Sequence, residues 1–167
     1  DMIELLNRKE TLHPELERFL VDTPAGFKAL KHPLVFAVPF FPGTEAMQNA
    51  SFKHKSAYAL EQQAKGNYSA YISIHERPYR FEAFLDICDK LDRKTYWELV
   101  RFIWVDTENA WEWLKVWQKV FRQKCAEKNA LMDDGELEVL AKLPMRVKVW
   151  RGSTRKNERG ISWTLDR

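Results

Sequence analysis

The sequence is poor in glycine, proline and cysteine. Its 167 residues include six Gly, seven Pro and two Cys, which excludes collagen-like, low-complexity and disulfide-rich chains. Cys88 and Cys125 have no second Cys or His at the spacing of a metal site. We therefore expect both to be reduced structural thiols of a cytoplasmic protein.

Long apolar runs and concentrated positive charge are also lacking. No run approaches the roughly 18 apolar residues that cross a bilayer, and the first ten residues lack the basic and apolar regions of a signal peptide. A net charge of +3 falls short of the basic stripe of a nucleic-acid-binding protein. We expect a soluble, cytoplasmic protein with no membrane partner, and the charge does not favour a nucleic-acid partner.

Several catalytic signatures are missing as well. The chain has no Walker loop, no G-x-G-x-x-G and no G-x-S-x-G elbow. The four histidines are scattered and have no partners at zinc-ligand spacing, so we expect no metal cofactor. They are His13, His32, His54 and His75.

What the chain does have is an aromatic, globular composition. Hydrophobic residues make up 45% of it and charged residues 31%, and there are ten Phe, seven Trp and five Tyr. Aromatic side chains bury large areas, so the core is expected to be aromatic. The length suits one domain, with room for a smaller second lobe.

Apolar residues recur at helical spacing through most of the chain. The stretch 44–65 is expected to bury Met47, Ala50, Ala57, Leu60 and Ala64 as one stripe. The stretch 32–43, with three prolines, is expected to be extended and buried, and the alternating stretch 68–80 to be a strand or irregular extended chain. Helices are predicted at 13–20, 23–31, 44–65, 78–91, 96–105, 108–128 and 135–143.

The helix boundaries are predicted from capping residues. Thr23 with Pro24 is expected to open 23–31, Thr95 to cap 96–105, and Asp106 or Thr107 to cap 108–128. Asp133 and Asp134 are expected to start the last helix, which ends at Pro144.

The residue choice changes after Pro144. Val147, Val149, Ile161 and Trp163 bring β propensity and period-two spacing. We therefore predict an α+β, predominantly helical fold. Residues 1–143 would form a helical region, and 144–167 a short β-hairpin or the first strands of a mixed sheet.

Two internal clusters could have chemical roles. The run "HERPYR" brings together His75, Glu76, Arg77 and Tyr79, an anion-binding or acid–base set, although the same residues suit the first turn of a helix. The run "WVDTEN" offers Asp106 and Glu108, but acidic residues also favour a helix N-terminus. In both runs we prefer the structural interpretation.

The closing run "VWRG…GISWTLD" is chemically more suggestive. Arg151 ends one β-like run, and Gly152 allows a ligand to approach the backbone closely. Ser162 and Thr164 share a strand face, with Trp163 on the other. An arginine fork can grip a diphosphate and hydroxyls can bind a ribose; the alternative is a hairpin with an exposed basic loop.

These residues resemble the arginine strand and the serine–threonine strand of the ADP-ribosyltransferase superfamily, in the form "hRG…G-hSWTxD" of many uncharacterised phage and bacterial proteins. The stretches "KHPLVFAVPF", "HERPYR", "YWELV", "WVDTENAW" and "LPMRVKVWRG" are similar to the helical region that precedes the motif in those proteins. The resemblance implies that NAD is the substrate and that any enzymatic activity is mono-ADP-ribosyl transfer to a macromolecule, most simply a protein.

The resemblance also implies roles for single residues. Arg151 would contact the NAD phosphates and ribose, and the Gly152 backbone would bind the nicotinamide carboxamide. Ser162 and Thr164 would occupy the first and third positions of the Ser-Thr-Ser motif, with Trp163 in place of its middle threonine.

One catalytic element is not found after Thr164. The family's glutamate, which stabilises the oxocarbenium-like transition state, would follow later, and Asp166 is poorly placed to substitute. We therefore expect the catalytic apparatus of these 167 residues to be incomplete.

Two other functions remain open. The first is a non-enzymatic phage or bacterial interaction protein that binds a host partner through an aromatic helical surface. The second is nucleic-acid binding, in which five basic residues would contact the phosphates: Lys148, Arg151, Arg155, Lys156 and Arg159.

Overall fold

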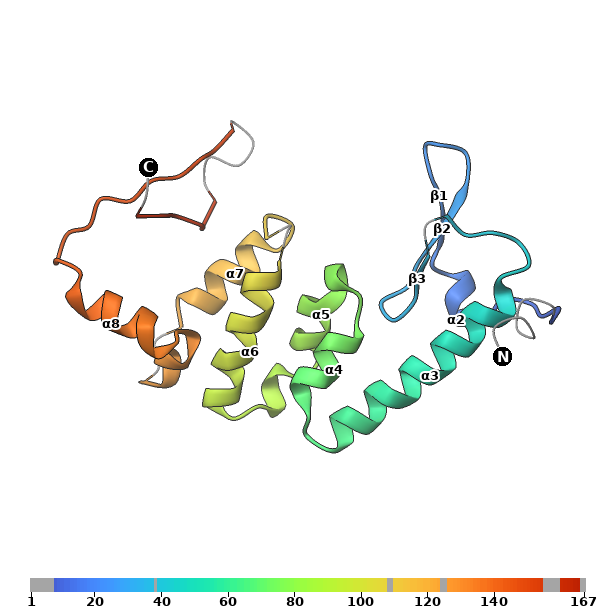
Figure 1. Cartoon of the computed structure of the whole chain (residues 1–167), viewed down its shortest axis with the longest axis horizontal. Helices are drawn as coiled ribbons and strands as arrows, with labels where there is room; N and C mark the ends of the chain where they lie inside the picture. The colour runs from blue at the N-terminus through green and yellow to red at the C-terminus, as the bar shows by residue number, and fades with distance from the viewer. Residues whose placement is uncertain (1–7, 38, 108–109, 124–125, 155–159, 166–167) are drawn as a thin grey trace. The chain divides into compact units, whose positions relative to one another are not determined.

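The computed structural model describes residues 8–37, 39–107, 110–123, 126–154 and 160–165. The chain divides into two compact units, residues 1–87 and residues 88–167 (Figure 1). The described residues contain seven α-helices and a three-stranded antiparallel sheet, which confirms the α+β, predominantly helical class. The predicted helical region 1–143 runs through the first unit into the second, and the boundary at residue 143 stays a prediction.

The first unit begins with a short helix and the small sheet. Helix α2 covers Pro14–Glu17, and its N-terminus is capped by the side chain of His13, which accepts a hydrogen bond from the Glu15 amide. The strands are β1 (Leu20–Asp22), β2 (Lys28–Lys31) and β3 (Phe36–Ala37), in that order. Strand β2 lies in the middle, pairing Leu20 with Leu30 and Lys31 with Phe36.

The helix predicted over 23–31 is wrong, because its first residues form a turn between β1 and β2. The Thr23 amide and hydroxyl both donate to the carbonyl of Phe27, at 2.9 and 2.8 Å. Gly26 has φ of +83°, a conformation that interrupts a right-handed helix and that glycine adopts without strain. Pro24, which suits a first helical turn, suits a tight turn equally well.

The stretch predicted to be extended and buried is so only in part. Residues 32–35 form the turn from β2 to β3, in which the amides and carbonyls of His32 and Val35 bond each other at 3.1 Å. Val35 is 3% exposed, whereas Phe36 is 41% and Phe41 59% exposed. The burial prediction therefore fails among the described residues after Val35.

Helix α3 (Glu45–Ala64) matches the helix predicted over 44–65 closely. Its C-cap is Lys65, and Gly66 follows with φ of +70°, as expected for a glycine that closes a helix. The predicted apolar stripe is wrong, because Leu60 is 67% exposed. The face that is buried carries Ala46, Gln48, Ala59 and Gln62.

The extended chain predicted over 68–80 is also wrong. Residues Tyr68–Ile74 form helix α4, whose N-terminus is capped by the Asn67 side chain, which accepts from the Ala70 amide. A 3-10 turn, η1 (Arg77–Tyr79), and helix α5 (Arg80–Leu85) follow, and Phe81 and Phe84 of α5 are buried. The alternating sequence pattern was not a reliable sign of a strand here. The neighbours Tyr71 and Ile72 are both buried in α4, whereas in a half-buried strand only one of two neighbours would be buried.

The second unit is built on helix α6 (Arg93–Asp106), with the 3-10 turn η2 (Cys88–Lys90) before it. The cap of α6 is Asp92 rather than Thr95. Its carboxylate accepts from the Thr95 amide at 3.0 Å and from the Thr95 hydroxyl at 2.5 Å. These hydrogen bonds hold the pKa of Asp92 below its usual value.

Helix α7 (Leu114–Phe121) is shorter than the helix predicted over 108–128. Asp106 and Thr107 do not cap it; they end α6, where the Thr107 hydroxyl donates to the carbonyl of Ile103 at 2.7 Å. The predicted aromatic core is found here. The ring of Trp117 lies 5.0 Å from that of Trp104 and 5.6 Å from that of Phe121.

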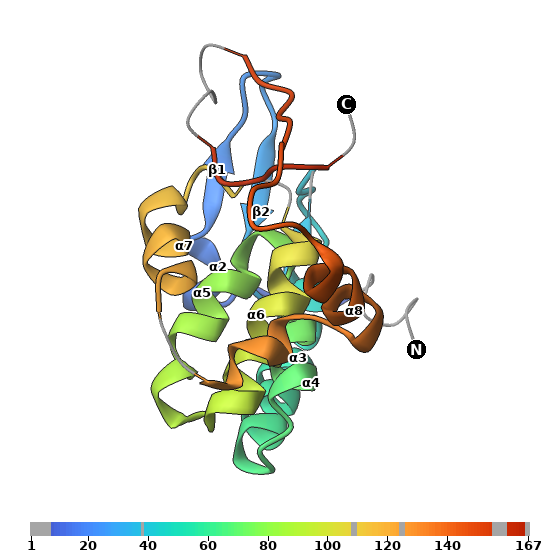
Figure 2. The same cartoon turned by 90° about the vertical axis from the view of Figure 1, so that its left-hand side faces the viewer.

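The prediction of a last helix that starts at Asp133 and Asp134 is confirmed. After the 3-10 turn η3 (Ala126–Leu131), helix α8 covers Asp134–Lys142, and Asp133 caps it in a reciprocal box with Glu136. The described residues after α8, 144–154 and 160–165, contain no further helix (Figures 1 and 2).

Candidate functional site

The closing segment brings together the two β-like runs that carry the predicted nucleotide-binding residues. Trp150 and Thr164 form an antiparallel bridge, in which the Trp150 amide donates to the Thr164 carbonyl at 2.8 Å and the Thr164 amide donates back at 2.9 Å. Within the described part of 144–167 the pairing is this single bridge, not the longer strands that were predicted. Val147 and Val149 are 38% and 44% exposed, so apolar packing of the kind that stabilises small sheets is weak here.

Arg151 lies across this strand pair. Its Nη1 donates a hydrogen bond to the carbonyl oxygen of Ser162 at 2.5 Å, which links residues eleven positions apart. Its side chain is half-buried, whereas Gly152 and Ser162 beside it are exposed. The guanidinium is therefore held against the serine–threonine run before any ligand is present.

The remaining predicted residues face solvent. Ser162 and Thr164 are exposed, and Trp163 is 56% exposed. A Cβ added at Gly152 would meet no atom within 4 Å, so the space beside this backbone is open. Hydroxyls, an open backbone and an arginine fork are a set that suits a sugar diphosphate.

Positive charge is present beside this site. The Nζ of Lys148 lies over the ring of Trp150, 4.3 Å from its centroid, which is a cation–π contact. Three members of the predicted phosphate-contacting set, Arg155, Lys156 and Arg159, lie outside the described residues, as does Asp166. Nucleic-acid binding by this loop stays untested.

The second candidate cluster, residues 75–80, is engaged in contacts within the first unit. The Nδ1 of His75 lies 2.8 Å from the Tyr71 carbonyl, and its ring packs edge-on against the ring of Tyr71. The Glu76 carboxylate accepts from Lys55 of α3 at 3.0 Å. The Tyr79 hydroxyl donates to the Lys31 carbonyl of β2 at 2.5 Å.

The ionisation of this cluster fits those contacts. Burial lowers the pKa of His75 below its usual value, and burial raises the pKa of Tyr79 above its usual value. The hydrogen bond from Tyr79 needs a protonated phenol, whereas the contact of His75 with the Tyr71 carbonyl needs a proton on Nδ1, which the neutral ring can carry. The structural interpretation of His75, Glu76, Arg77 and Tyr79 therefore accounts for three of the four side chains, and a role in ligand binding stays a prediction.

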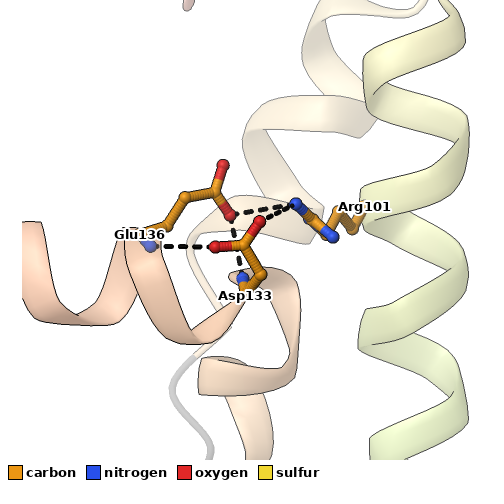
Figure 3. A network of polar contacts seen from close by, with 3 residues as sticks. All are labelled: Arg101, Asp133 and Glu136. Atoms are coloured by element: carbon orange, nitrogen blue, oxygen red, sulfur yellow. Dashed lines mark hydrogen bonds and ion pairs between the residues drawn. The ribbon is translucent and has the colours of Figure 1, made fainter.

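One polar network was not predicted from the sequence. Arg101 of α6 donates from Nη2 to Asp133 at 2.8 Å and to Glu136 at 3.2 Å (Figure 3). A hydrogen bond from the Glu136 amide, with Arg101 as a further cause, holds the pKa of Asp133 below its usual value. Asp133 was expected to start the last helix, but nothing in the sequence indicated Arg101 as its partner.

A pocket of about 440 Å³ adjoins this network. It is lined by residues of α6, η3 and α8, among them Lys94, Glu98 and Asn129, and by Met132 between η3 and α8. Because Arg101 is already paired with two carboxylates, its charge is largely compensated. We assign the network to holding α8 on α6.

Metal and thiol chemistry is not indicated in the described ranges. They contain no group of three or more His, Cys, Asp or Glu side chains arranged to hold a metal ion. Burial, with the Asp89 carboxylate adding to it, raises the pKa of the Cys88 thiol, which makes it a poorer nucleophile. Cys125 lies outside the described residues.

A helix long and apolar enough to span a bilayer does not occur in the part of the chain that the structure describes. No protein-family model, curated protein or solved structure matches the chain. The candidate site is therefore defined by its residues and their geometry.

Proposed function

We propose that the closing segment is the first part of an NAD-binding site of the ADP-ribosyltransferase type. One observation supports the proposal most directly. The Trp150–Thr164 bridge and the hydrogen bond from Arg151 to Ser162 place the arginine run beside the serine–threonine run. The resemblance requires this juxtaposition, and the sequence alone left open whether the two runs would meet.

The chemistry of the site suits a dinucleotide. The Arg151 guanidinium is a planar donor fork that fits a diphosphate, while the exposed hydroxyls of Ser162 and Thr164 can bind a ribose. The open space at Gly152 gives a carboxamide access to backbone donors and acceptors. Trp163 is exposed beside them and can report binding through its fluorescence.

The proposed reaction of the site is mono-ADP-ribosyl transfer. The bond between nicotinamide and ribose breaks, nicotinamide leaves, and a nucleophile of a target protein forms the new bond to the ribose. A carboxylate is needed to stabilise the positive charge that develops on the ribose, and Asp166 is poorly placed for this. Our proposal for these residues is therefore NAD binding, in the cytoplasm, with turnover dependent on a suitably placed carboxylate.

Calorimetric titration of the chain with NAD tests the proposal. Arg151→Ala removes the fork, and Arg146→Ala is the matched control, because it removes an exposed arginine of the same segment. A charge-assisted hydrogen bond contributes about 1.5 to 3 kcal/mol, so Arg151→Ala should weaken NAD binding by roughly 10- to 100-fold. Arg146→Ala should leave it within about twofold.

Two further titrations separate the ligand classes. ADP-ribose should bind, since it keeps the diphosphate and both riboses, whereas inorganic pyrophosphate should bind more weakly. The proposal is refuted if the unaltered chain does not bind NAD, or if the two arginine variants lose the same affinity.

A second function is favoured by a separate observation on α6. Phe102 is 40% and Val105 77% exposed, and both line a pocket of about 470 Å³ with Glu98, Arg101 and Asp106. An apolar patch with charges at its edge is typical of protein-binding surfaces. The patch supports the alternative function, in which the chain is a non-enzymatic interaction protein that binds a host partner.

Affinity capture distinguishes this function from the first. One stoichiometric partner that is retained by the chain and lost with Val105→Asp, without any NAD binding, would establish it. NAD binding that depends on Arg151 but not on Val105 would count against it.

A further inference from the structure

Gly160 lies directly against the guanidinium of Arg151. A Cβ built at Gly160 would be 1.8 Å from Nη2 of Arg151, 2.3 Å from Cζ and 2.8 Å from Nη1. Heavy atoms that are not bonded do not approach this closely. The space that a side chain at position 160 would fill is therefore already occupied by the guanidinium of Arg151.

The other glycine of the segment differs. A Cβ at Gly152 would meet nothing within 4 Å, and neither glycine has the positive φ that would demand glycine on conformational grounds. At Gly160 the reason for glycine is thus the contact with Arg151, and backbone strain plays no part.

We infer that Gly160 is a positioning residue, whose missing side chain lets the Arg151 guanidinium lie across the strand pair and donate to the Ser162 carbonyl. The effect of Gly160 on the position of Arg151 follows from the geometry alone. Its effect on ligand binding rests on the proposed NAD site, in which Arg151 is the phosphate-binding residue.

The arrangement has an energetic consequence for an anionic ligand. A free arginine side chain loses rotamer entropy when it is fixed. Contacts with Gly160 and Ser162 fix part of the Arg151 side chain in advance, so a ligand that binds the fork has less ordering to impose. Gly160 would in this way raise affinity without touching the ligand.

Gly160→Ala should act on Arg151 alone. The clashing atoms are at the far end of a flexible side chain, which can swing into solvent, so the Trp150–Thr164 bridge has no reason to break. The variant should therefore free the guanidinium from Ser162 while the two runs stay paired.

Nitrogen NMR of arginine-labelled protein tests this without any ligand. The Arg151 guanidinium signal is identified as the one that Arg151→Ala removes. In the unaltered chain the chemical shift of this signal should differ from the shifts of exposed arginines. Gly160→Ala should bring the Arg151 shift into the range of the exposed arginines. Gly152→Ala, the same change in open space, should not move it. Amide exchange at Trp150 and Thr164 shows whether the bridge persists.

Calorimetry then connects the arrangement to NAD. Gly160→Ala should weaken NAD binding by up to about tenfold, which corresponds to about 1.4 kcal/mol. In the Arg151→Ala background the same change should have no further effect, because its only route to the ligand has been removed.

The outcomes separate this inference from the proposed function. A guanidinium signal that Gly160→Ala leaves in place, or that Gly152→Ala moves equally, overturns the inference. If the signal responds as expected but the unaltered chain does not bind NAD, the positioning role stands and the proposed function fails. If NAD binds and Gly160→Ala weakens it equally with and without Arg151, the positioning role is wrong.

Discussion

Acidification should destabilise the first unit because His32 is held there as a neutral side chain. The residue is 6% exposed, and its ring packs edge-on against Phe19 and Phe52, with centroids at 4.7 and 5.0 Å. Its Nδ1 accepts a hydrogen bond from the Leu34 amide at 3.1 Å, which a proton on that nitrogen would abolish. Burial lowers the pKa of His32, and His75 and His13 add to the shift, while Glu15 opposes it.

The sign and size of the effect follow from proton linkage. An unfolded histidine has a pKa of about 6.5, so as the pH falls below this value the unfolded chain takes up a proton that the folded unit refuses. The stability contributed by neutral His32 is complete above about pH 6.5 and falls by about 1.4 kcal/mol per pH unit, until the folded pKa is reached. His75, whose pKa burial also lowers, brings the slope to at most about 2.7 kcal/mol per pH unit.

The distribution of tryptophan makes the measurement specific. All seven Trp lie between residues 97 and 163, in the second unit. Urea unfolding followed by Trp fluorescence therefore reports on the second unit, whereas amide exchange at Ala29 and Leu30, both fully buried in the sheet, reports on the first. Exchange rates corrected for the intrinsic effect of pH should reveal the loss of stability in the sheet.

A matched pair of variants identifies the histidine. His32→Asn keeps an acceptor for the Leu34 amide but cannot take up a proton, so it should lower the stability at neutral pH and flatten the pH dependence. His54→Asn, at an exposed position of α3, should leave the slope as it is. A first unit equally stable at pH 7.5 and at about pH 5, or a slope unchanged by His32→Asn, would refute the reasoning.

Three further changes test the packing and the turns. Trp117→Ala deletes a fully buried indole between Trp104 and Phe121. It should lower the free energy of unfolding of the second unit, measured in urea, by about 3 to 5 kcal/mol. A loss below about 1 kcal/mol would contradict the place of Trp117 in the core. Arg101→Ala should cost less than about 1 kcal/mol and should speed amide exchange in α8, more at low salt than at high salt; equal effects at both would mean that the ion pair is not the cause. Gly26→Ala places a side chain at φ of +83° and should destabilise the first unit by about 1 to 2 kcal/mol, measured by exchange in β2, without altering Trp fluorescence.

Local signals in the sequence determined the elements whose cause is local. The capping box at Asp133 and Glu136, the helix that Gly66 closes and the buried Phe81 and Phe84 all depend on residues within a few positions of one another. Composition and propensity were likewise enough for the α+β class. These features were predictable because hydrogen bonds and apolar contacts within one or two turns already favour them in the isolated segment.

Tertiary structure decided what the local signals left ambiguous. Pro24 and the alternation in 68–75 are compatible with either a helix or an extended chain, and the choice depended on the pairing of β2 with both neighbours and on the burial of Tyr71 beside Ile72. At the candidate site, the sequence supplied Arg151, Gly152, Ser162, Trp163 and Thr164. Only the fold placed the guanidinium of Arg151 on the carbonyl of Ser162 and in the space that Gly160 leaves open, because such contacts join residues whose distance no local pattern sets.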